Sequence, residues 1–168
     1  VSSRSGSADM LECLGMPLPL HEAEAVDCLQ ATNFTFLFAP AYHPAMKAVV
    51  PIRGALSVRT VFNVLGPLTN PAAPPYQLIG AYSKEAAKPM AETLSGMPIE
   101  RAFVVHGEPG WDEATPAGDF VLYDVRPGSV VEEIRSPGDY GLEVCTPEAL
   151  QGGDAEQNAR ELIRVFTG

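Results

Sequence analysis

The chain has 168 residues, 46% of them hydrophobic and 19% charged, which is typical of a globular domain with a sizeable core and excludes a disordered segment. Its longest apolar runs are far shorter than the roughly 20 residues that a membrane-spanning helix needs, so we expect no membrane span. Three widely spaced cysteines without a C-x-x-C pair disfavour a disulfide framework and a structural zinc site, and they favour a reducing, cytoplasmic setting.

The net charge of -10 is distributed unevenly along the chain. A negative total argues against a nucleic-acid-binding surface, because such a surface uses Lys and Arg to neutralise phosphates. From residue 28 to residue 84, however, the sequence has no acidic residue and four basic ones: Lys47, Arg53, Arg59 and Lys84. An anionic small molecule would suit this basic segment, although charge alone is equally compatible with a surface that lacks acids by chance.

The first quarter of the chain predicts two helices and a buried strand. Ala8–Leu14 follows a Ser- and Gly-rich segment and stops at Gly15, as a short helix does. A second helix is expected over His21–Gln30. Phe34–Ala39 is a compact apolar and aromatic run, typical of a buried strand, and Pro40 closes it.

The middle of the chain predicts a β-α-β unit. A helical pattern over Val58–Leu65 ends before a Gly-Pro pair. The strand-like runs Gln77–Tyr82 and Ala102–His106 then flank a helix over Lys84–Leu94. Their continuous hydrophobicity, rather than alternation, indicates strands covered on both faces, so we expect them to be parallel.

The last third of the chain predicts a hairpin and a terminal helix. Phe120–Val125 and Val130–Ile134 are joined by a short turn and are expected at an edge of the sheet. Asp154–Phe166 has the apolar stripe of an amphipathic helix. The fold class expected is therefore α/β, with a central, mostly parallel sheet flanked by helices.

A serine-rich segment, Ser2–Ser7, immediately precedes the first predicted helix. Hydroxyl groups and free backbone N–H groups at the positive end of a helix are what a phosphate needs. On spacing alone, a solvated loop or a helix cap is the commoner explanation of such a segment.

Two consecutive acids, Asp112 and Glu113, follow the turn Gly107–Trp111 at the carboxyl end of a predicted parallel strand. Ligands gather at this edge of open α/β sheets, and two hard carboxylates suit Mg²⁺ there. As a bare dipeptide, a pair of acids in an exposed turn is the commoner occurrence.

Three other side chains are candidates for chemistry. Arg53 follows Pro51 within the basic segment, and its guanidinium could pair with a carboxylate or could tie helix ends together. His43 and His106 could transfer protons near neutral pH. Because a structural hydrogen bond is the commoner role for a His beside a turn, we assign neither of them to catalysis.

Several long strings place the sequence near a known family. Residues 1–12, Val-Ser-Ser-Arg-Ser-Gly-Ser-Ala-Asp-Met-Leu-Glu, resemble the phosphoribosyl-pyrophosphate loop of the anthranilate phosphoribosyltransferases, which belong to the nucleoside phosphorylase superfamily. Further matching strings follow in the same order across nearly the whole chain: Phe36–Pro40, His43–Lys47, Pro51–Arg53, Arg59–Asn63, Leu65–Pro71, Val105–Gly107, Asp112–Glu113 and Gly153–Ala155.

The resemblance implies a site in three parts. Val1, Ser2, Ser3 and Ser7 would bind phosphoribosyl pyrophosphate. Arg53 would bind the carboxylate of anthranilate, and Asp112 and Glu113 would bind Mg²⁺. Trp111 stands where the family more usually has Leu, so the packing of this loop departs from the family's pattern.

The resemblance also implies a reaction: transfer of the phosphoribosyl group to anthranilate, in tryptophan biosynthesis, by a cytoplasmic homodimer. Residues 1–168 are expected to be one incomplete α/β domain, a central fragment. The N-terminal helical domain, the first phosphate loop and the C-terminal end would lie outside it, and the fragment alone would be inactive.

Two alternatives from the same superfamily have the same fold. One is a nucleoside phosphorylase, which the intact Pro51–Arg53 string disfavours. The other is a nucleic-acid-binding paralogue, which the Asp112–Glu113 pair and the net charge disfavour.

Overall fold

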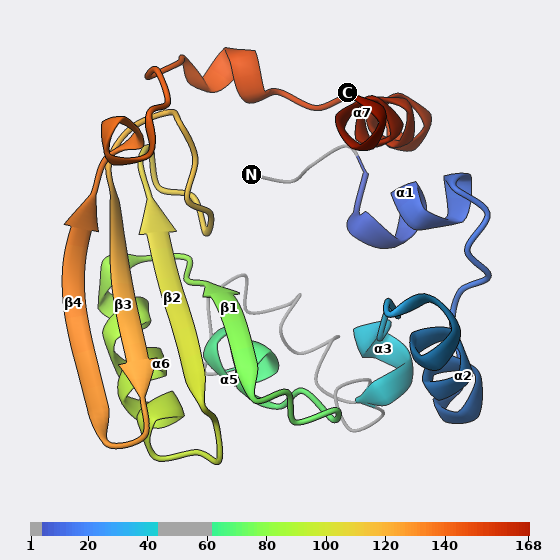
Figure 1. Ribbon diagram of the computed structural model, residues 1–168, viewed down its shortest axis with the longest axis horizontal. Coiled ribbons are helices and arrows are strands. Elements are labelled where there is room, and N and C mark those ends of the chain that lie inside the picture. The colour runs from blue at the N-terminus through green and yellow to red at the C-terminus, as the bar shows by residue number, and fades with distance from the viewer. Residues whose placement is uncertain (1–4, 44–61) are drawn as a thin grey trace, which may run out of the picture. The chain divides into compact units, whose positions relative to one another are not determined.

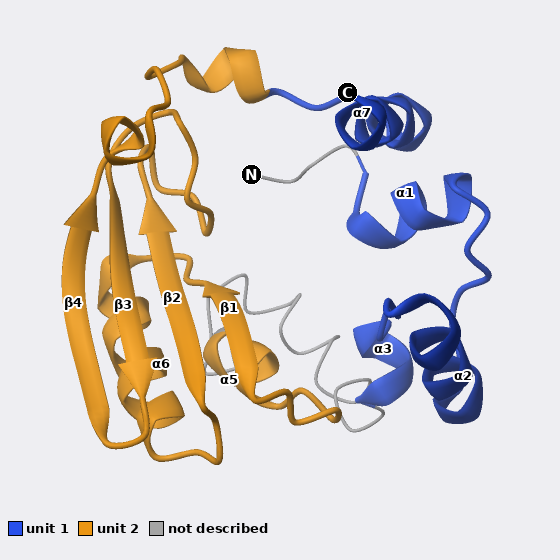
Figure 2. Ribbon diagram, viewed as in Figure 1, with its two compact units in different colours: residues 1–57, 151–168 blue, residues 58–150 orange. Residues whose placement is uncertain are grey.

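The structure is a computed structural model that describes residues 5–43 and 62–168. The chain divides into two compact units: residues 1–57 with 151–168 form the first, and residues 58–150 form the second (Figure 2). The single domain expected from the sequence stays a prediction. Within the described ranges, no helix is long and apolar enough to cross a membrane.

The second unit is built on a four-stranded sheet with the order β1-β2-β3-β4 (Figure 1). Its strands are β1 (Tyr76–Gly80), β2 (Arg101–Gly107), β3 (Phe120–Arg126) and β4 (Ser129–Arg135). Strands β1 and β2 run parallel, with Gly80 opposite Val105, and helix α6 (Lys84–Ser95) connects them. The predicted β-α-β unit is confirmed, and so are the α/β class and the hairpin.

In these four strands the sheet is mixed rather than mostly parallel. Strand β3 is antiparallel to β2, and β4 is antiparallel to β3, so β1–β2 is the one parallel pair in the described sheet. The connections explain the difference, because a parallel pair needs a crossover of about a dozen residues or more, usually helical. Only Pro127 and Gly128 separate β3 from β4, and Gly128 has the positive φ of +69° that a tight turn requires.

Helix α6 covers one face of the sheet, and this contact forms the core of the second unit (Figure 1). Ala87 and Ala91 allow the helix to approach the strands closely, while Met90 and Leu94 fill the space between them; all four side chains are buried. The sheet contributes mainly Ile79, Ala102, Val104, Val121, Tyr123 and Val125. The helix begins with a side-chain cap, in which Ser83 Oγ accepts the N–H of Ala86 at 3.2 Å.

Helix α5 (Phe62–Leu68) precedes β1 and overlaps the predicted helix Val58–Leu65, whose first four residues lie outside the described residues. It continues through Gly66 and Pro67, where the prediction ended it. The extension places Leu68 in the core, so burial of that side chain favours the extra turn. Beyond β4 lie two short 3₁₀ helices, η1 (Pro137–Tyr140) and η2 (Pro147–Leu150).

The first unit is helical in its described part. Its helices are α1 (Ser7–Cys13), α2 (Glu22–Thr32), α3 (Ala39–Tyr42) and α7 (Ala155–Thr167). The predicted helices that begin near residues 8, 21 and 154 are confirmed. Helices α1 and α7 pack together, although they come from opposite parts of the sequence. Asp154 caps α7, its Oδ1 accepting the N–H of Gln157 at 2.9 Å.

The buried strand predicted over Phe34–Ala39 is wrong. Residues 34–38 form no regular element, and α3 begins at Ala39. A strand needs neighbours for its N–H and C=O groups, and within the described ranges the one sheet present is that of residues 76–135. The carbonyl of Phe34 instead accepts a hydrogen bond from the Thr32 hydroxyl at 2.9 Å, and Phe34 itself is half exposed.

A Leu→Ala substitution should destabilise the fold by very different amounts on the two sides of the sheet. Leu94→Ala should lower the free energy of unfolding by about 2 to 5 kcal/mol, because it opens a cavity between α6 and the sheet. Leu78→Ala, at a position of β1 that is 74% exposed, is the matched control and should change it by about 0.5 kcal/mol or less. Urea unfolding followed by circular dichroism tests this, and equal losses would contradict the described core.

Candidate functional site

The two acids predicted to bind metal lie in the loop between β2 and β3. Asp112 and Glu113 are both exposed, and they follow the carboxyl end of β2. Because β1 and β2 are parallel, the carboxyl ends of both strands lie at this same edge of the sheet. The location expected for the pair from the sequence is therefore confirmed, whereas its role stays a prediction.

Backbone hydrogen bonds hold the start of this loop. Gly107 N–H donates to the Trp111 carbonyl and Trp111 N–H donates to the Gly107 carbonyl, each at 2.9 Å, so the loop turns back on the end of β2. Gly110, with φ at +110°, makes the reversal possible. At the base of the loop, Glu108 N–H donates to the Asp119 carbonyl at 3.0 Å. Residues 107–111 thus form a hydrogen-bonded turn that places Asp112 at the edge of the sheet.

The loop also packs directly against two glycines at the strand ends. A Cβ atom added to Gly80 would overlap the carbonyl oxygen of Asp112, and one added to Gly107 would overlap the carbonyl oxygen of Glu113. The main chain of the acidic pair therefore lies where side chains of β1 and β2 would otherwise be. Successive residues of a strand point to opposite faces, and Val104 points into the α6 core, so Gly107 faces away from α6.

His106 ties the two strand ends together on the other face. Its ring is buried, at 8% exposed, and its Nδ1 lies 2.8 Å from the carbonyl oxygen of Ala81. Because a carbonyl oxygen can only accept, Nδ1 carries the proton in this bond. Ala81 N–H also donates to the Val105 carbonyl at 2.8 Å. This is the structural kind of hydrogen bond that the sequence favoured over a catalytic role for His106.

Charged groups at the start of α6 adjoin the same loop. Lys84 Nζ lies 3.9 Å from Glu108 Oε1, but both side chains are more than half exposed, so the pair contributes little stability. The pKa of Glu85 is lowered, mainly because its carboxylate accepts a hydrogen bond from its own backbone N–H and another from Ser83. The positive charge of Lys84 lowers it further, while loss of hydration opposes the shift. The carboxylate of Glu85 is thus favoured in the ionised form.

The acidic pair fits a magnesium ion that is shared with a phosphate. Among the described residues, no basic side chain forms an ion pair with Asp112 or Glu113, so both carboxylates can accept a cation. Magnesium prefers oxygen ligands and commonly binds through one or two carboxylates plus substrate phosphates. Within the described part of the chain, no group of three or more His, Cys, Asp or Glu side chains is placed to coordinate a metal ion without other ligands. The rest of the coordination shell would come from phosphate and water.

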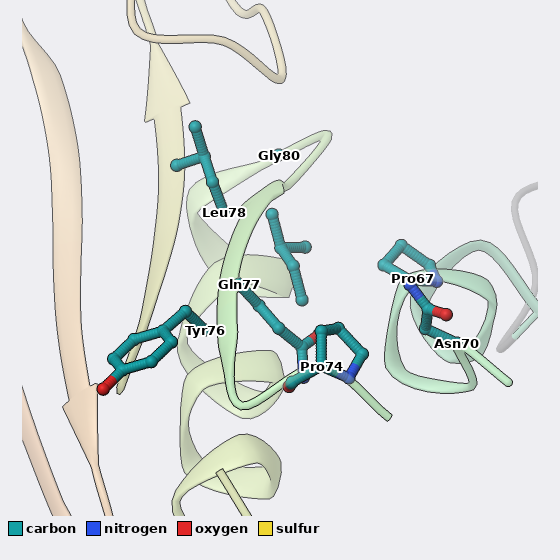
Figure 3. Close-up of a pocket in the computed structure, with 8 residues that line it drawn as sticks. Pro67, Asn70, Pro74, Tyr76, Gln77, Leu78 and Gly80 are labelled. Atoms are coloured by element: carbon teal, nitrogen blue, oxygen red, sulfur yellow. The ribbon is translucent and has the colours of Figure 1, made fainter. Parts of the chain in front are cut away.

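A shallow groove of the second unit adjoins the acidic pair. It measures about 360 Å³ and runs along the edge of β1 that pairs with no other described strand, between β1 and residues that end or follow α5 (Figure 3). Its lining includes Pro67, Asn70 and Gln77, and it reaches Gly80 at one end. The groove contains no charged side chain, so it adds space beside the site but no chemistry to it.

In the first unit, the structure describes only the end of the predicted phosphoribosyl-pyrophosphate loop. Val1, Ser2 and Ser3 lie outside the described residues. Ser7 is exposed and begins α1, and Gly6 N–H before it donates to Asp9 Oδ2 at 2.7 Å. Arg53 also lies outside the described residues, as do Lys47 and Arg59. The binding roles of these residues remain predictions.

Asn158, which the sequence pattern did not single out, anchors this loop. Its Nδ2 donates to Ser5 Oγ at 2.9 Å and to the Gly153 carbonyl at 3.2 Å, and its Oδ1 accepts the N–H of Gly153 at 2.9 Å. One amide thus joins the Ser5 loop to the turn before α7. In the sequence, the one indication of this role was the presence of Asn inside a predicted amphipathic helix, a position where Asn is otherwise unfavourable.

The family follows from a comparison with known proteins. Residues 1–168 match the model of the glycosyl transferase family, a/b domain, and the chain belongs to this family. Among similar proteins are enzymes named anthranilate phosphoribosyltransferase. The one from Rubrobacter xylanophilus is 47% identical over 167 residues, which are 99% of this chain and 49% of the relative.

Solved structures give the same result for the fold. The crystal structure of anthranilate phosphoribosyltransferase from Thermus thermophilus superposes with a TM-score of 0.83 at 44% identity, covering 96% of this chain and 47% of that one. The enzyme from Saccharomyces cerevisiae in complex with phosphoribosyl pyrophosphate and magnesium gives 0.85 at 31% identity, covering 94% and 44%. The chain thus spans about half the length of the relatives that it matches.

The Asn158 anchor can be tested by substitution. Asn158→Ala removes three hydrogen bonds and leaves the N–H of Gly153 without its partner, so we expect a loss of about 1 to 3 kcal/mol in the free energy of unfolding. Gln30→Ala, at an exposed position of α2, should cost about 0.5 kcal/mol or less and is the control. Chemical denaturation measures both, and similar values for the two variants would rule out the anchor.

Proposed function

We propose that the full-length protein containing this chain is an anthranilate phosphoribosyltransferase. Membership of the glycosyl transferase family and the similarity to enzymes of that name along the whole chain support the proposal. The observation that carries it is the Asp112–Glu113 pair, seated at the carboxyl edge of two parallel strands and unpaired within the described part. An acidic pair placed in this way suits a magnesium-bound pyrophosphate group.

The proposed reaction joins the amine of anthranilate to C1 of the ribose. The nitrogen lone pair forms the new bond while the bond from C1 to the pyrophosphate oxygen breaks, and pyrophosphate leaves with that electron pair. The nitrogen then loses one proton to the solvent. Magnesium, when bound, supplies neutralisation of the pyrophosphate charge.

The residues of the chain would act by binding and orientation rather than by proton transfer. Asp112 and Glu113 would hold the cation. Val1, Ser2, Ser3 and Ser7 would hold the phosphoribosyl group, with backbone N–H groups at the start of α1 directed to phosphate oxygens. Arg53 would pair with the anthranilate carboxylate and so fix the direction from which the amine attacks.

The remaining features of the proposal come from the resemblance and from structures of related enzymes. Structures of the yeast enzyme hold 4-fluoroanthranilate in one case and phosphoribosyl pyrophosphate with magnesium in another. We propose the corresponding substrates and Mg²⁺ for the full-length protein. We also propose that it acts in tryptophan biosynthesis as a cytoplasmic homodimer.

The reaction can be followed by the loss of anthranilate fluorescence when phosphoribosyl pyrophosphate is added to the full-length protein. Decay should require Mg²⁺. Arg53→Ala should raise the KM for anthranilate about 10- to 100-fold, because a charge-assisted hydrogen bond contributes about 1.5 to 3 kcal/mol. Arg126→Ala, at an exposed end of β3, is the control and should leave the KM unchanged. Absence of decay in a folded protein supplied with magnesium would refute the proposal.

The metal role of the acidic pair predicts a separate effect. Asp112→Asn and Glu113→Gln should each raise the Mg²⁺ concentration needed for half-maximal activity about tenfold or more, since each removes an anionic oxygen ligand. Asp119→Asn changes an exposed acid of the same loop and should leave that concentration unchanged. A uniform effect of all three substitutions would indicate a general charge effect instead of coordination.

A further inference from the structure

The acidic pair contacts the sheet through its main chain. The carbonyl oxygen of Asp112 lies against Gly80 of β1, and that of Glu113 lies against Gly107 of β2. Two consecutive residues of the loop therefore rest on two neighbouring strands. Because the backbone is fixed at both residues, the starting points of both carboxylate side chains are fixed as well.

Both glycines are required for space and not for conformation. Neither Gly80 nor Gly107 is among the described residues with positive φ, so an L-amino acid could adopt either backbone conformation. What excludes another residue is the position of the carbonyl oxygens, which a Cβ atom would overlap. These oxygens belong to the backbone and cannot rotate away as the end of a side chain can.

The two strand ends beneath the loop are held at a fixed spacing. Gly80 is opposite Val105 in the parallel register, and Ala81 N–H continues the pairing by donating to the Val105 carbonyl at 2.8 Å. The buried ring of His106 adds its bond of 2.8 Å to the Ala81 carbonyl. The two glycines that support the loop therefore belong to the hydrogen-bonded sheet and not to the loop itself.

We propose that Gly80 and Gly107 are positioning residues of the metal site, which seat the main chain of Asp112 and Glu113 so that both carboxylates are in place before the cation binds. This proposal rests on the proposed function for the assignment of a cation to the acidic pair. A preformed loop avoids the conformational entropy that would be lost if the cation had to order it. The two glycines act through Asp112 and Glu113 and do not touch the cation.

The test uses Mn²⁺ as a probe for Mg²⁺ and measures binding instead of turnover. Free Mn²⁺ is titrated by electron paramagnetic resonance in the full-length protein and in Gly80→Ala and Gly107→Ala. We expect the affinity for Mn²⁺ at this site to fall about 10- to 100-fold in each, the usual effect of removing a support behind a metal ligand. Circular dichroism and thermal unfolding report whether each variant is folded.

Two control variants separate the possible failures. Gly96→Ala, at the end of α6, has room for its methyl group and should bind Mn²⁺ as the unchanged protein does. Asp112→Asn should weaken this binding about tenfold or more, as it does for Mg²⁺. If Asp112→Asn leaves binding unchanged, the metal assignment of the proposed function fails. If Asp112→Asn weakens binding while folded Gly80→Ala and Gly107→Ala bind normally, the proposal for the two glycines fails alone.

Hydrogen exchange of the unchanged protein provides a test that does not depend on the folding of any variant. The amides of Gly107 and Trp111 form mutual hydrogen bonds in the loop, so we expect both to exchange slowly without metal and to change less than about twofold when Mn²⁺ is added. Fast exchange without metal, followed by protection on adding Mn²⁺, would show that the cation orders the loop and would overturn the proposal.

Discussion

The parallel pairing of β1 with β2 is the constraint on which the candidate metal site depends. A parallel pair requires a crossover, and α6 supplies it by packing Met90 and Leu94 onto one face of the sheet. The crossover returns the chain so that both strands end at the same edge. In that arrangement a single loop contacts Gly80 and Gly107 at the same time.

The opposite face of the sheet has a different character. Apolar side chains of β1, β2 and β3 there, including Leu78, Phe103 and Leu122, line a hollow of about 280 Å³ together with residues 114–116 of the acidic loop and with η1. The loop that carries the acidic pair thus also borders an apolar surface. A single segment of the chain combines a polar edge, suited to charged groups, with an apolar face beside it.

Much of the fold followed from local sequence patterns, because those patterns reflect local physics. The helices were recognised by apolar periodicity and by terminating residues such as Gly15, and the β-α-β unit by continuous apolar runs. The strand at Phe34–Ala39 failed because an apolar run reveals a tendency to be buried but not the presence of a partner strand. The mixed direction of the sheet likewise depended on connections and not on strand composition.

The candidate site, like the fold, could be predicted only in part. The position of Asp112 and Glu113 could be predicted, since it follows from strand order and from the end of a strand. The contacts of Gly80 and Gly107 with the backbone of this pair could not be predicted. A glycine at the end of a strand suggests a turn and gives no information about which backbone atom will approach it. The contact between Asp112 and Gly80 joins residues from different strands and loops, and the role of Asn158 likewise depends on a partner far along the chain.

The hydrogen bond between Asn158 and Ser5 has a consequence for the order of folding. It joins residues that are 153 positions apart, and the whole second unit, a continuous segment from residue 58 to residue 150, lies between them in the sequence. During synthesis, the sheet and α6 can form as soon as their own segment has emerged. The packing of α1 with α7 must wait until α7 has been made. Helix α1 therefore remains without this partner while residues 14–154 and then α7 itself are being translated.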